Sequence, residues 1–348
     1  METFHRPIFS DATAMDAVED GSINLVLTSP PYPMVQMWDT VFSLQDPAIG
    51  RALENQQGPL AFEAMHRILD QVWTECFRVL APGGFACINI GDATRSLGSE
   101  FALYPNHSRI LSKALSLGFT CLPTIIWRKQ TNAPNKFMGS GMLPAGAYVT
   151  LEHEYILILR KGGKRVFTSE AQRQRRRESA IFWEERNQWF SDVWMDIKGS
   201  RQALGNKETR GRSAAYPFEL AHRLTLMYSV KQDRILDPFL GLGTTMAAAM
   251  ATGRNSLGYE IDPNLGPVIA QTSEAAVAMG KEAAQSRLKK HERFIQERCR
   301  LKGPTKHWNA PHDMAVVTAQ EKELHLSPPK DIEMDPTHLV PEYFKITY

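Results

Sequence analysis

Ser29, Pro30, Pro31 and Tyr32 form the stretch of this chain whose side chains could do chemistry together. They follow residues 22–27, an apolar run that predicts a buried strand. The prolines stop that strand, which makes the stretch a stiff turn at a strand's carboxyl end, where open α/β sheets bind ligands. A serine oxygen and a proline carbonyl can accept both hydrogens of an amine, and the tyrosine ring can stack on a base. The turn indicates a site for a base with an exocyclic amine; a strand-ending turn with a packed tyrosine is the alternative.

A second segment, residues 234–251, has the pattern of a short strand, a glycine turn and an alanine-rich helix. The glycines allow the backbone to approach a ligand closely, and the first N–H groups of the helix would face that ligand. A dinucleotide fingerprint would require glycine where Met246 stands, which weakens an NAD or FAD interpretation. Glu260 ends the next predicted strand, where an acid can accept hydrogen bonds from ribose hydroxyls. Tight packing between strand and helix is the alternative explanation for the glycines.

Together the two segments resemble the amino-methyltransferases of DNA, which use S-adenosylmethionine. Ser-Pro-Pro-Tyr is similar to their catalytic motif, and Asp-Pro-Phe-x-Gly-x-Gly-Thr-Thr, beginning at Asp237, is similar to their cofactor loop. The catalytic motif comes first along the chain, an order that resembles the circularly permuted β class of restriction–modification systems. The resemblance covers about residues 5–270.

The resemblance implies an α/β, Rossmann-like methyltransferase fold with a mostly parallel, twisted sheet and a permuted motif order. It gives the catalytic role to Ser29, Pro30, Pro31 and Tyr32. It implies that S-adenosylmethionine binds to Asp11, Phe218, Asp237, Pro238, Phe239, Gly241, Gly243, Thr244 and Glu260. In this assignment Asp11 faces the cofactor adenine, and Phe218 belongs to a segment that packs over the methionine end.

The apolar spacing between these motifs predicts the elements that must position them. Residues 62–80 and 108–117 have helical periodicity, and strands are expected at about 23–28, 85–90, 120–127 and 153–159. Such alternation predicts a mostly parallel sheet with helices on both faces. We expect a catalytic half at 1–160, a basic target-recognition insertion at 161–212, a cofactor-binding half at 213–270, and a helical extension with an acidic tail at 271–348.

Residues 160–212 are strongly basic, with 14 Lys and Arg against 7 Asp and Glu, a net charge of +7. Basic side chains neutralise phosphates, and arginine can read guanine edges. In the β class the target-recognition region occupies this place in the chain. The predicted DNA-binding residues are Arg173, Arg175, Arg176, Arg177, Lys198, Arg201, Lys207 and Arg210. A solvated charged surface is the alternative.

Composition gives no indication of a metal-binding, disulfide-rich or membrane protein. The net charge of the 348 residues is only +2, and the four cysteines, Cys76, Cys87, Cys121 and Cys299, lie far apart, so neither a metal site nor a disulfide framework is indicated. No apolar run is long enough to cross a membrane, and no signal peptide is evident. We expect a cytoplasmic, nucleoid-associated prokaryotic protein that acts on double-stranded DNA, with a cognate restriction endonuclease as a separately acting partner.

The resemblance also suggests the chemistry. Methylation of cytosine carbon 5 needs a nucleophilic thiolate, which the enzymes that perform it carry in a Pro-Cys pair, and no cysteine here follows a proline. Family members with serine first in the catalytic motif mostly modify cytosine N4, so Ser29 favours cytosine N4 methylation of a base flipped out of the duplex. Adenine N6 methylation and a non-catalytic DNA-binding protein are the main alternatives. An NAD-dependent oxidoreductase and an RNA substrate are weaker ones.

Overall fold

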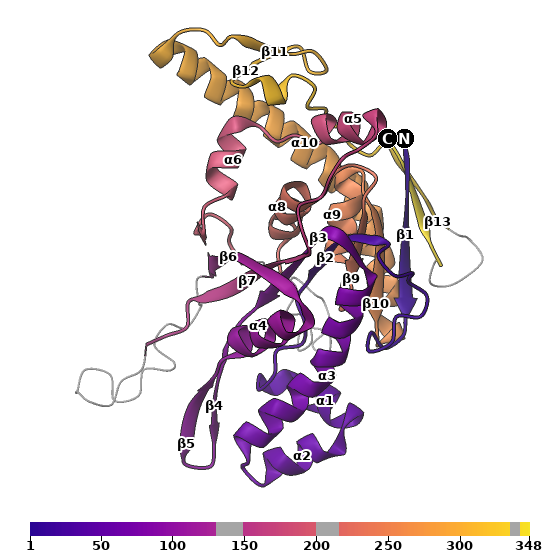
Figure 1. The fold of residues 1–348 in the computed structure, drawn as a ribbon, viewed down its shortest axis with the longest axis vertical. Helices are drawn as coiled ribbons and strands as arrows, with labels where there is room; N and C mark the ends of the chain where they lie inside the picture. The colour runs from indigo at the N-terminus through magenta and orange to yellow at the C-terminus, as the bar shows by residue number, and fades with distance from the viewer. Residues whose placement is uncertain (130–148, 200–215, 335–341) are drawn as a thin grey trace.

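A computed structural model describes residues 1–129, 149–199, 216–334 and 342–348 (Figure 1). Its centre is one sheet of ten strands in the order β13-β14-β1-β10-β9-β2-β3-β7-β6-β8. The expectations for Arg201, Lys207 and Arg210 lie outside the described residues.

Five adjacent strands in the middle of the sheet are parallel: β1 (Glu2–Phe9), β10 (Asn255–Glu260), β9 (Arg234–Asp237), β2 (Ile23–Thr28) and β3 (Leu80–Ile90). Beyond β3, the strand β7 (His153–Lys161) is antiparallel to both β3 and β6 (Phe119–Arg128), and the short β8 (Val193–Trp194) runs parallel to β6. The predicted mostly parallel α/β sheet is confirmed, and all four predicted strand ranges fall within observed strands.

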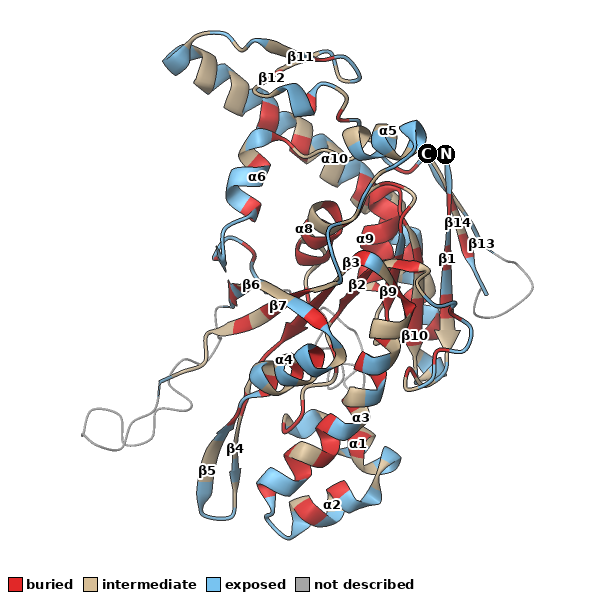
Figure 2. Cartoon of the chain, viewed as in Figure 1, coloured by how far each residue is buried: buried red, intermediate tan, exposed pale blue. Residues whose placement is uncertain are grey.

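Helices cover both faces of the sheet, as the alternating pattern predicted. Side chains of β2 alternate between two cores, with Ile23 and Val26 in one and Leu25 and Leu27 in the other. On the first face lie α3 (Gly58–Val79) and α4 (Asn106–Leu117), whose apolar stripes match the predicted helices. On the second face lie α8 (Phe218–Tyr228) and α9 (Thr244–Thr252), with α10 (Gly266–Lys302) packed on α9. Buried residues concentrate in these central strands and in α9 (Figure 2).

The remaining elements lie at the two ends of the sheet. At the lower end in Figure 1 are α1 (Asp39–Gln45), α2 (Pro47–Glu54) and the hairpin of β4 (Ala93–Leu97) and β5 (Glu100–Tyr104). At the upper end are α5 (Glu170–Glu178), α6 (Trp183–Trp189) and the hairpin of β11 (His307–Asn309) and β12 (Met314–Val316). Single 3₁₀ turns occur at Gln36–Trp38, Pro263–Leu265 and Ala319–Glu321. No helix in the described part of the chain is long and apolar enough to span a membrane.

The end of the chain belongs to the main sheet. The strand β14 (Phe344–Thr347) pairs antiparallel with β1, and β13 (Asp331–Met334) pairs with β14. Phe344 and Ile346 are fully buried because they pack into the core beneath α9 and α10. These strands shield β1, whose backbone groups would otherwise form an unpaired sheet edge. The acidic tail is thus partly structural, and the domain boundaries expected at 160 and 270 fall inside β7 and α10.

Candidate active site

The carboxyl ends of β1, β10, β9 and β2 meet at one edge because the four strands are parallel. The chain leaves β9 toward β10 and leaves β2 toward β3, in opposite directions across the sheet. Open α/β sheets bind ligands at such a switch point. A cavity of about 670 Å³ lies there, lined by residues that include Asp11, Ser29, Pro30, Pro31, Trp38, Tyr216, Asp237, Pro238, Phe239, Gly241, Thr244 and Glu260.

Asp237 connects the end of β2 to the glycine loop and to the start of α9 through hydrogen bonds. Its Oδ1 accepts hydrogen bonds from Thr28 Oγ1 at 2.6 Å and from the backbone N–H of Phe239 at 3.0 Å, and its Oδ2 accepts from Thr245 Oγ1 at 2.5 Å. Tyr216 in turn hydrogen-bonds Thr245. Burial raises the pKa of the Asp237 carboxyl to about 6, although the hydrogen bonds from Thr245 and Thr28 oppose that shift. The carboxylate therefore fixes the turn of residues 29–32, the predicted catalytic turn, relative to the glycine loop.

Glu260 fixes the glycine loop at the cavity through hydrogen bonds to the backbone. Its two carboxylate oxygens accept from the backbone N–H groups of Gly241 at 2.8 Å and Asp262 at 2.9 Å. Gly241 and Gly243 have φ of 54° and 84°, a left-handed conformation that side chains with a Cβ rarely adopt. Gly243 then starts α9, whose first N–H groups lie at the cavity end of that helix. Burial raises the pKa of Glu260.

The catalytic turn leads into a chain of polar side chains. Ser29 Oγ lies 3.1 Å from the hydroxyl of Tyr32, and this hydroxyl donates to Glu154 Oε2 at 2.9 Å. Asn89 Nδ2 donates to the same Glu154 oxygen at 2.7 Å and to the Tyr32 oxygen at 2.9 Å. Burial, followed by the charge of Glu154, raises the pKa of Tyr32 well above its ordinary value, so the phenol keeps its proton.

Gly91 leaves room for the Tyr32 ring. A Cβ at this position would lie 3.0 Å from Tyr32 Cε2, which is closer than side-chain contacts normally allow. The ring is consequently wedged between its own turn and the backbone that follows β3. Its orientation is set at both ends, by Gly91 along the ring and by Glu154 and Asn89 at the hydroxyl.

The structure brings most predicted site residues to one cavity and leaves three of them outside its lining. Tyr32 and Gly243 adjoin the cavity through Ser29 and Thr244. Phe218 does not line it: its ring stacks on His222 within α8 and packs into the core, which it can do because it is the first residue of that helix. Tyr216, two residues earlier, takes the place at the cavity that was expected for Phe218.

Sequence reasoning missed Glu154, Asn89 and Thr28, and it gave no separate role to Thr245, the last residue of the glycine-loop motif. A usable signal existed for the first two, because each is a polar residue beside the apolar run of its strand, at the end nearer the cavity. Thr28 gave no signal, since threonine is common in strands.

Comparisons with known proteins agree with this geometry. A family model described as DNA methylase, of the N6/N4 methyltransferase type, matches residues 23–271. The chain belongs to that family. It is 51% identical over 331 residues to the type II methyltransferase M.MthZI of Methanothermobacter thermautotrophicus, covering 95% of this chain and 92% of that protein. It is also 47% identical to M.MjaI of Methanocaldococcus jannaschii, over 77% of this chain and 90% of that protein.

Among solved structures, TTHA0409 of Thermus thermophilus, a candidate DNA modification methylase crystallised with S-adenosyl-L-methionine, superposes with a TM-score of 0.60. Its sequence is 32% identical, and the match covers 79% of this chain and 95% of TTHA0409.

The predicted DNA-binding residues of this methylase fall into two groups. Those of α5 lie at the amino ends of the parallel strands, because Ser179, directly after the helix, accepts a hydrogen bond from the N–H of Lys231, just before β9. Arg173 and Arg177 are paired with Glu170, and Arg177 also with Glu323. Arg176 lies over the Phe167 ring. The structure does not bring Arg173, Arg175, Arg176 or Arg177 to the cavity, so their contact with DNA stays a prediction.

Lys198 lies on the cavity side of the sheet. It is exposed, and its neighbour Gly199 lies beside the Lys129 side chain at the end of β6. Ile197, just before it, accepts a hydrogen bond from Trp127 of β6 at 2.9 Å. Lys198 and Lys129 are therefore exposed cations near the catalytic turn.

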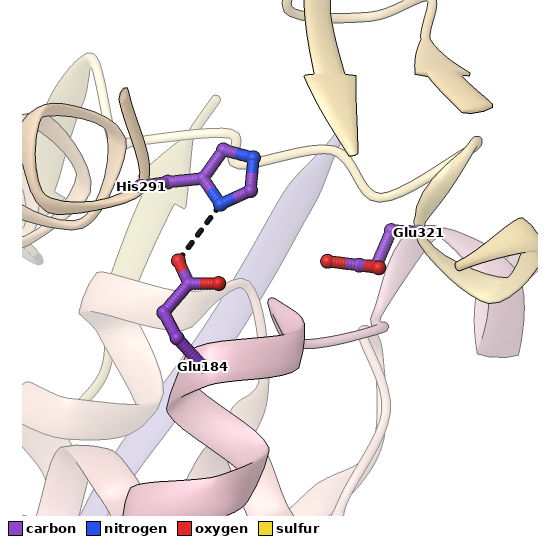
Figure 3. A group of neighbouring side chains, drawn as sticks. All are labelled: Glu184, His291 and Glu321. Atoms are coloured by element: carbon purple, nitrogen blue, oxygen red, sulfur yellow. Dashed lines mark hydrogen bonds and ion pairs between the residues drawn. The ribbon is translucent and has the colours of Figure 1, made fainter. Parts of the chain in front are cut away.

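Glu184, His291 and Glu321 form a cluster of metal-ligand types far from the cavity, between α6 and α10 (Figure 3). His291 Nδ1 lies 2.7 Å from Glu184 Oε1, and its Nε2 lies 2.9 Å from the carbonyl of Ala315. Burial opposes the charged form of His291, but the hydrogen bonds to Glu184 and Ala315 outweigh it and raise the pKa. Glu321 accepts from Trp183 and Thr318. The arrangement is that of an imidazolium ion pair, and no nitrogen of His291 is free to bind a metal.

Proposed function

We propose that this DNA methylase transfers a methyl group from S-adenosylmethionine to the exocyclic N4 amine of cytosine in double-stranded DNA. The observation that carries the proposal is the placement of Ser29 and Pro30 in the same cavity as the Asp237–Glu260 loop. An amine held by the turn would therefore lie next to a molecule held by the loop. Methylation of adenine N6 by the same machinery is the alternative.

The residues present fit S-adenosylmethionine. A cavity of about 670 Å³ lies within the ordinary range of cofactor sites, which is about 300–1,000 Å³. Its lining combines apolar groups such as Phe239 with carboxylates at Asp11 and Glu260, which suit an adenine and ribose hydroxyls. When bound, the cofactor would supply an electrophilic methyl group on a sulfonium. Asp237, Gly241 and Thr244 complete the proposed cofactor site.

The catalytic turn would act on the lone pair of the target amine. An aromatic amine is a weak nucleophile because this lone pair is delocalised into the ring. Ser29 Oγ and the Pro30 carbonyl would accept the two N–H bonds, draw the nitrogen toward a tetrahedral shape and localise the lone pair. Positioning and preorganised acceptors of this kind account for much of enzymatic acceleration. The neutral hydroxyl of Ser29 supports cytosine as the target, since family members with serine here mostly modify cytosine.

Contact with DNA at the cavity edge would come from exposed cations. Lys129 and Lys198 lie there, and Arg201, Lys207 and Arg210 follow Lys198 in sequence. A flipped base costs a few kcal/mol of lost stacking, and stacking on Tyr32 would return about 1–3 kcal/mol. We further propose that the modified sites protect DNA from a separately acting restriction endonuclease, and that the protein is cytoplasmic and associated with the nucleoid.

Nucleoside analysis tests the proposal directly. DNA from cells expressing the protein, Ser29→Ala or the surface control Ser116→Ala is digested and examined by mass spectrometry. We expect N4-methylcytosine with the unmutated protein and with Ser116→Ala, and none with Ser29→Ala. N6-methyladenine in that pattern would replace cytosine by adenine as the target. Absence of both marks, from folded protein that binds S-adenosylmethionine, would contradict the assignment of duplex DNA as the substrate.

A further inference from the structure

A continuous path of hydrogen bonds leads from the catalytic turn to a carboxylate outside the cavity. It runs from Ser29 Oγ to the Tyr32 hydroxyl over 3.1 Å and from that hydroxyl to Glu154 Oε2 over 2.9 Å. Glu154 stands on β7, two strands away from β2 in the sheet, and does not line the cavity. Among the described residues, its carboxylate is therefore linked to the turn at Ser29 through the hydroxyl of Tyr32.

Methylation of an amine creates a need for such a path. As the bond from nitrogen to the methyl carbon forms, the bond from that carbon to the sulfonium sulfur of the donor breaks, and its electron pair stays on sulfur. The nitrogen still holds both hydrogens and becomes positively charged, so one proton must leave. A protonated aromatic amine is a strong acid because losing the proton restores delocalisation, and an ordinary carboxylate is a strong enough base to receive it.

We infer that Glu154 receives this proton through Tyr32 and Ser29. The amine proton passes to Ser29 Oγ while the serine proton passes to the Tyr32 oxygen and the tyrosine proton passes to Glu154 Oε2. At the end both hydroxyls are neutral again, the methylated amine is neutral, and Glu154 is a carboxylic acid that returns its proton to water. The inference rests on the proposed function and holds equally for a cytosine or an adenine amine.

The surroundings of Glu154 suit an acceptor at the end of a relay. Its oxygens are held by Asn89 from β3 and by Lys129, whose Nζ lies 2.9 Å from Oε1 at the end of β6. Glu154 is only 9% exposed, but the Lys129 side chain is 47% exposed, which provides a short route to solvent. Within the described residues, Tyr32 and Lys129 are the titratable side chains that contact the Glu154 carboxylate. The buried phenol keeps its proton, so it can donate and accept in one step.

Glu154→Gln tests the relay because it keeps the shape of the side chain and removes the proton acceptor. Glu152→Gln is the matched control: Glu152 precedes the same strand, pairs with Arg128 and does not touch Tyr32. Single-turnover methylation of unmodified bacteriophage DNA is measured with labelled S-adenosylmethionine across pH. Relayed general-base catalysis is worth about 100-fold or more. We expect a loss of that order in Glu154→Gln at neutral pH, and unmutated behaviour in Glu152→Gln across the pH range.

A measurement without turnover separates the relay from a structural role. Tyrosine labelled with ¹³C at Cζ reports the titration of Tyr32 by NMR, with Tyr32→Phe identifying the signal. Removing the Glu154 charge should lower the pKa of Tyr32 while leaving the affinity for S-adenosylmethionine unchanged. An unaltered Tyr32 titration would overturn the inference.

The two proposals fail in different ways. If the unmutated protein makes neither methylated base, the proposed function is wrong. If the mark is made and Glu154→Gln turns over as fast as Glu152→Gln, only the relay is wrong. If Glu154→Gln is slow because it no longer binds S-adenosylmethionine, Glu154 is a structural residue and the relay is likewise wrong.

Discussion

Asp237 acts mainly on other residues of the protein, because donors from β2, α9 and its own loop occupy both carboxylate oxygens. A buried carboxylate needs such donors, since an ion without partners is very costly in an apolar interior. These three contacts therefore help to fix the turn of residues 29–32 relative to the glycine loop, together with the pairing of β2 and β9. Thr28 is the most informative of these partners, because it immediately precedes Ser29.

We predict that Thr28→Val lowers the free energy of unfolding by about 1.5–3 kcal/mol, the usual value of a hydrogen bond to a charged group. The affinity for S-adenosylmethionine should fall as well, because the loop loses its tie to β2. Denaturant titration and calorimetry measure the two effects. Thr225→Val is a close control, since Thr225 is equally buried and its hydroxyl has no partner among the described residues. Equal losses in the two variants would refute a special role for Thr28.

A pair of substitutions at Tyr32 separates its ring from its hydroxyl. Tyr32→Ala should lose most turnover, because both the stacking surface and the relay disappear, whereas binding of S-adenosylmethionine should survive. Tyr32→Phe keeps the ring and should retain base binding while it lowers the single-turnover rate. Filter binding to DNA and rapid-quench kinetics provide the comparison. Loss of cofactor binding in Tyr32→Ala would indicate misfolding instead.

Among single residues, the sequence predicted site residues that belong to a contiguous motif, but it did not predict those whose partners are distant in sequence. Ser29, Pro30, Pro31 and most of the Asp237–Glu260 loop were found because each motif is local, and the cavity gathers them. Glu154 and Tyr32 are 122 residues apart, and no local pattern relates them. Phe218 does not line the cavity and Tyr216 does, because a segment beside a helix start does not show which ring faces the cavity and which enters the core.

Among the elements, α6 and α10 are joined by charged contacts as well as by apolar packing. Arg287 of α10 makes two hydrogen bonds to Glu185 of α6, at 2.6 Å and 2.7 Å, and both side chains are buried. One helical turn later His291 contacts Glu184 and stacks on Phe182. The long helix thereby holds the segment that leads to β8 and to the cavity side.

Glu184→Gln should weaken this junction in a pH-dependent manner. The pKa of His291 is raised in the folded protein, so its stabilising effect is complete below the unfolded value of about 6.5 and is lost as pH rises through the folded value. As pH rises from about 6.5 through the folded pKa of His291, the free energy of unfolding of the unmutated protein should therefore decline. Glu184→Gln should show a smaller decline. Urea titrations at several pH values measure this, with the exposed neighbour Glu292→Gln as control. If the free energy of unfolding depended on pH in the same way in Glu184→Gln and in the unmutated protein, the ion pair between Glu184 and His291 would not stabilise the fold.

The helices and strands themselves were largely predictable from the sequence, but their positions relative to one another were less so. Periodicity located α3, α4 and the central strands, since each buries one face or both. The charge of residues 160–212 did not reveal that α5 would lie at the amino end of the sheet, because its arginines find partners there in Glu170 and Glu323. Nor could the acidity of the tail indicate β14, whose Phe344 and Ile346 alternate with polar residues.

Across the whole molecule, buried histidines should govern stability in acid. Burial lowers the pKa of His5 and His222 to about 3 and of His66 to about 4. The unfolded chain binds these protons near pH 6.5, so stability is present above that pH and lost as pH falls toward the folded values. Each histidine should cost about 2 kcal/mol at pH 5 relative to neutral pH. Asp237, with a raised pKa, acts in the opposite direction.

His222→Leu provides the test, because the Nδ1 of His222 has no hydrogen-bond partner among the described residues. We predict a shallower loss of unfolding free energy between pH 7 and pH 5 in this variant, by about 2 kcal/mol at pH 5. Chemical denaturation at the two pH values measures the difference. An unchanged slope would mean that other groups control the acid transition.

The hydrogen bond between Thr28 and Asp237 can form only late in synthesis of the chain. The two residues are 209 positions apart, and β2 obtains its neighbour β9 only when that late segment exists. At about 5–20 residues per second, a ribosome needs roughly 10–40 s to travel from one to the other. Throughout that interval the finished catalytic turn has no loop beside it, so a growing chain cannot modify DNA. The order of the strands therefore sets a lower limit on the time between synthesis of β2 and assembly of the cavity.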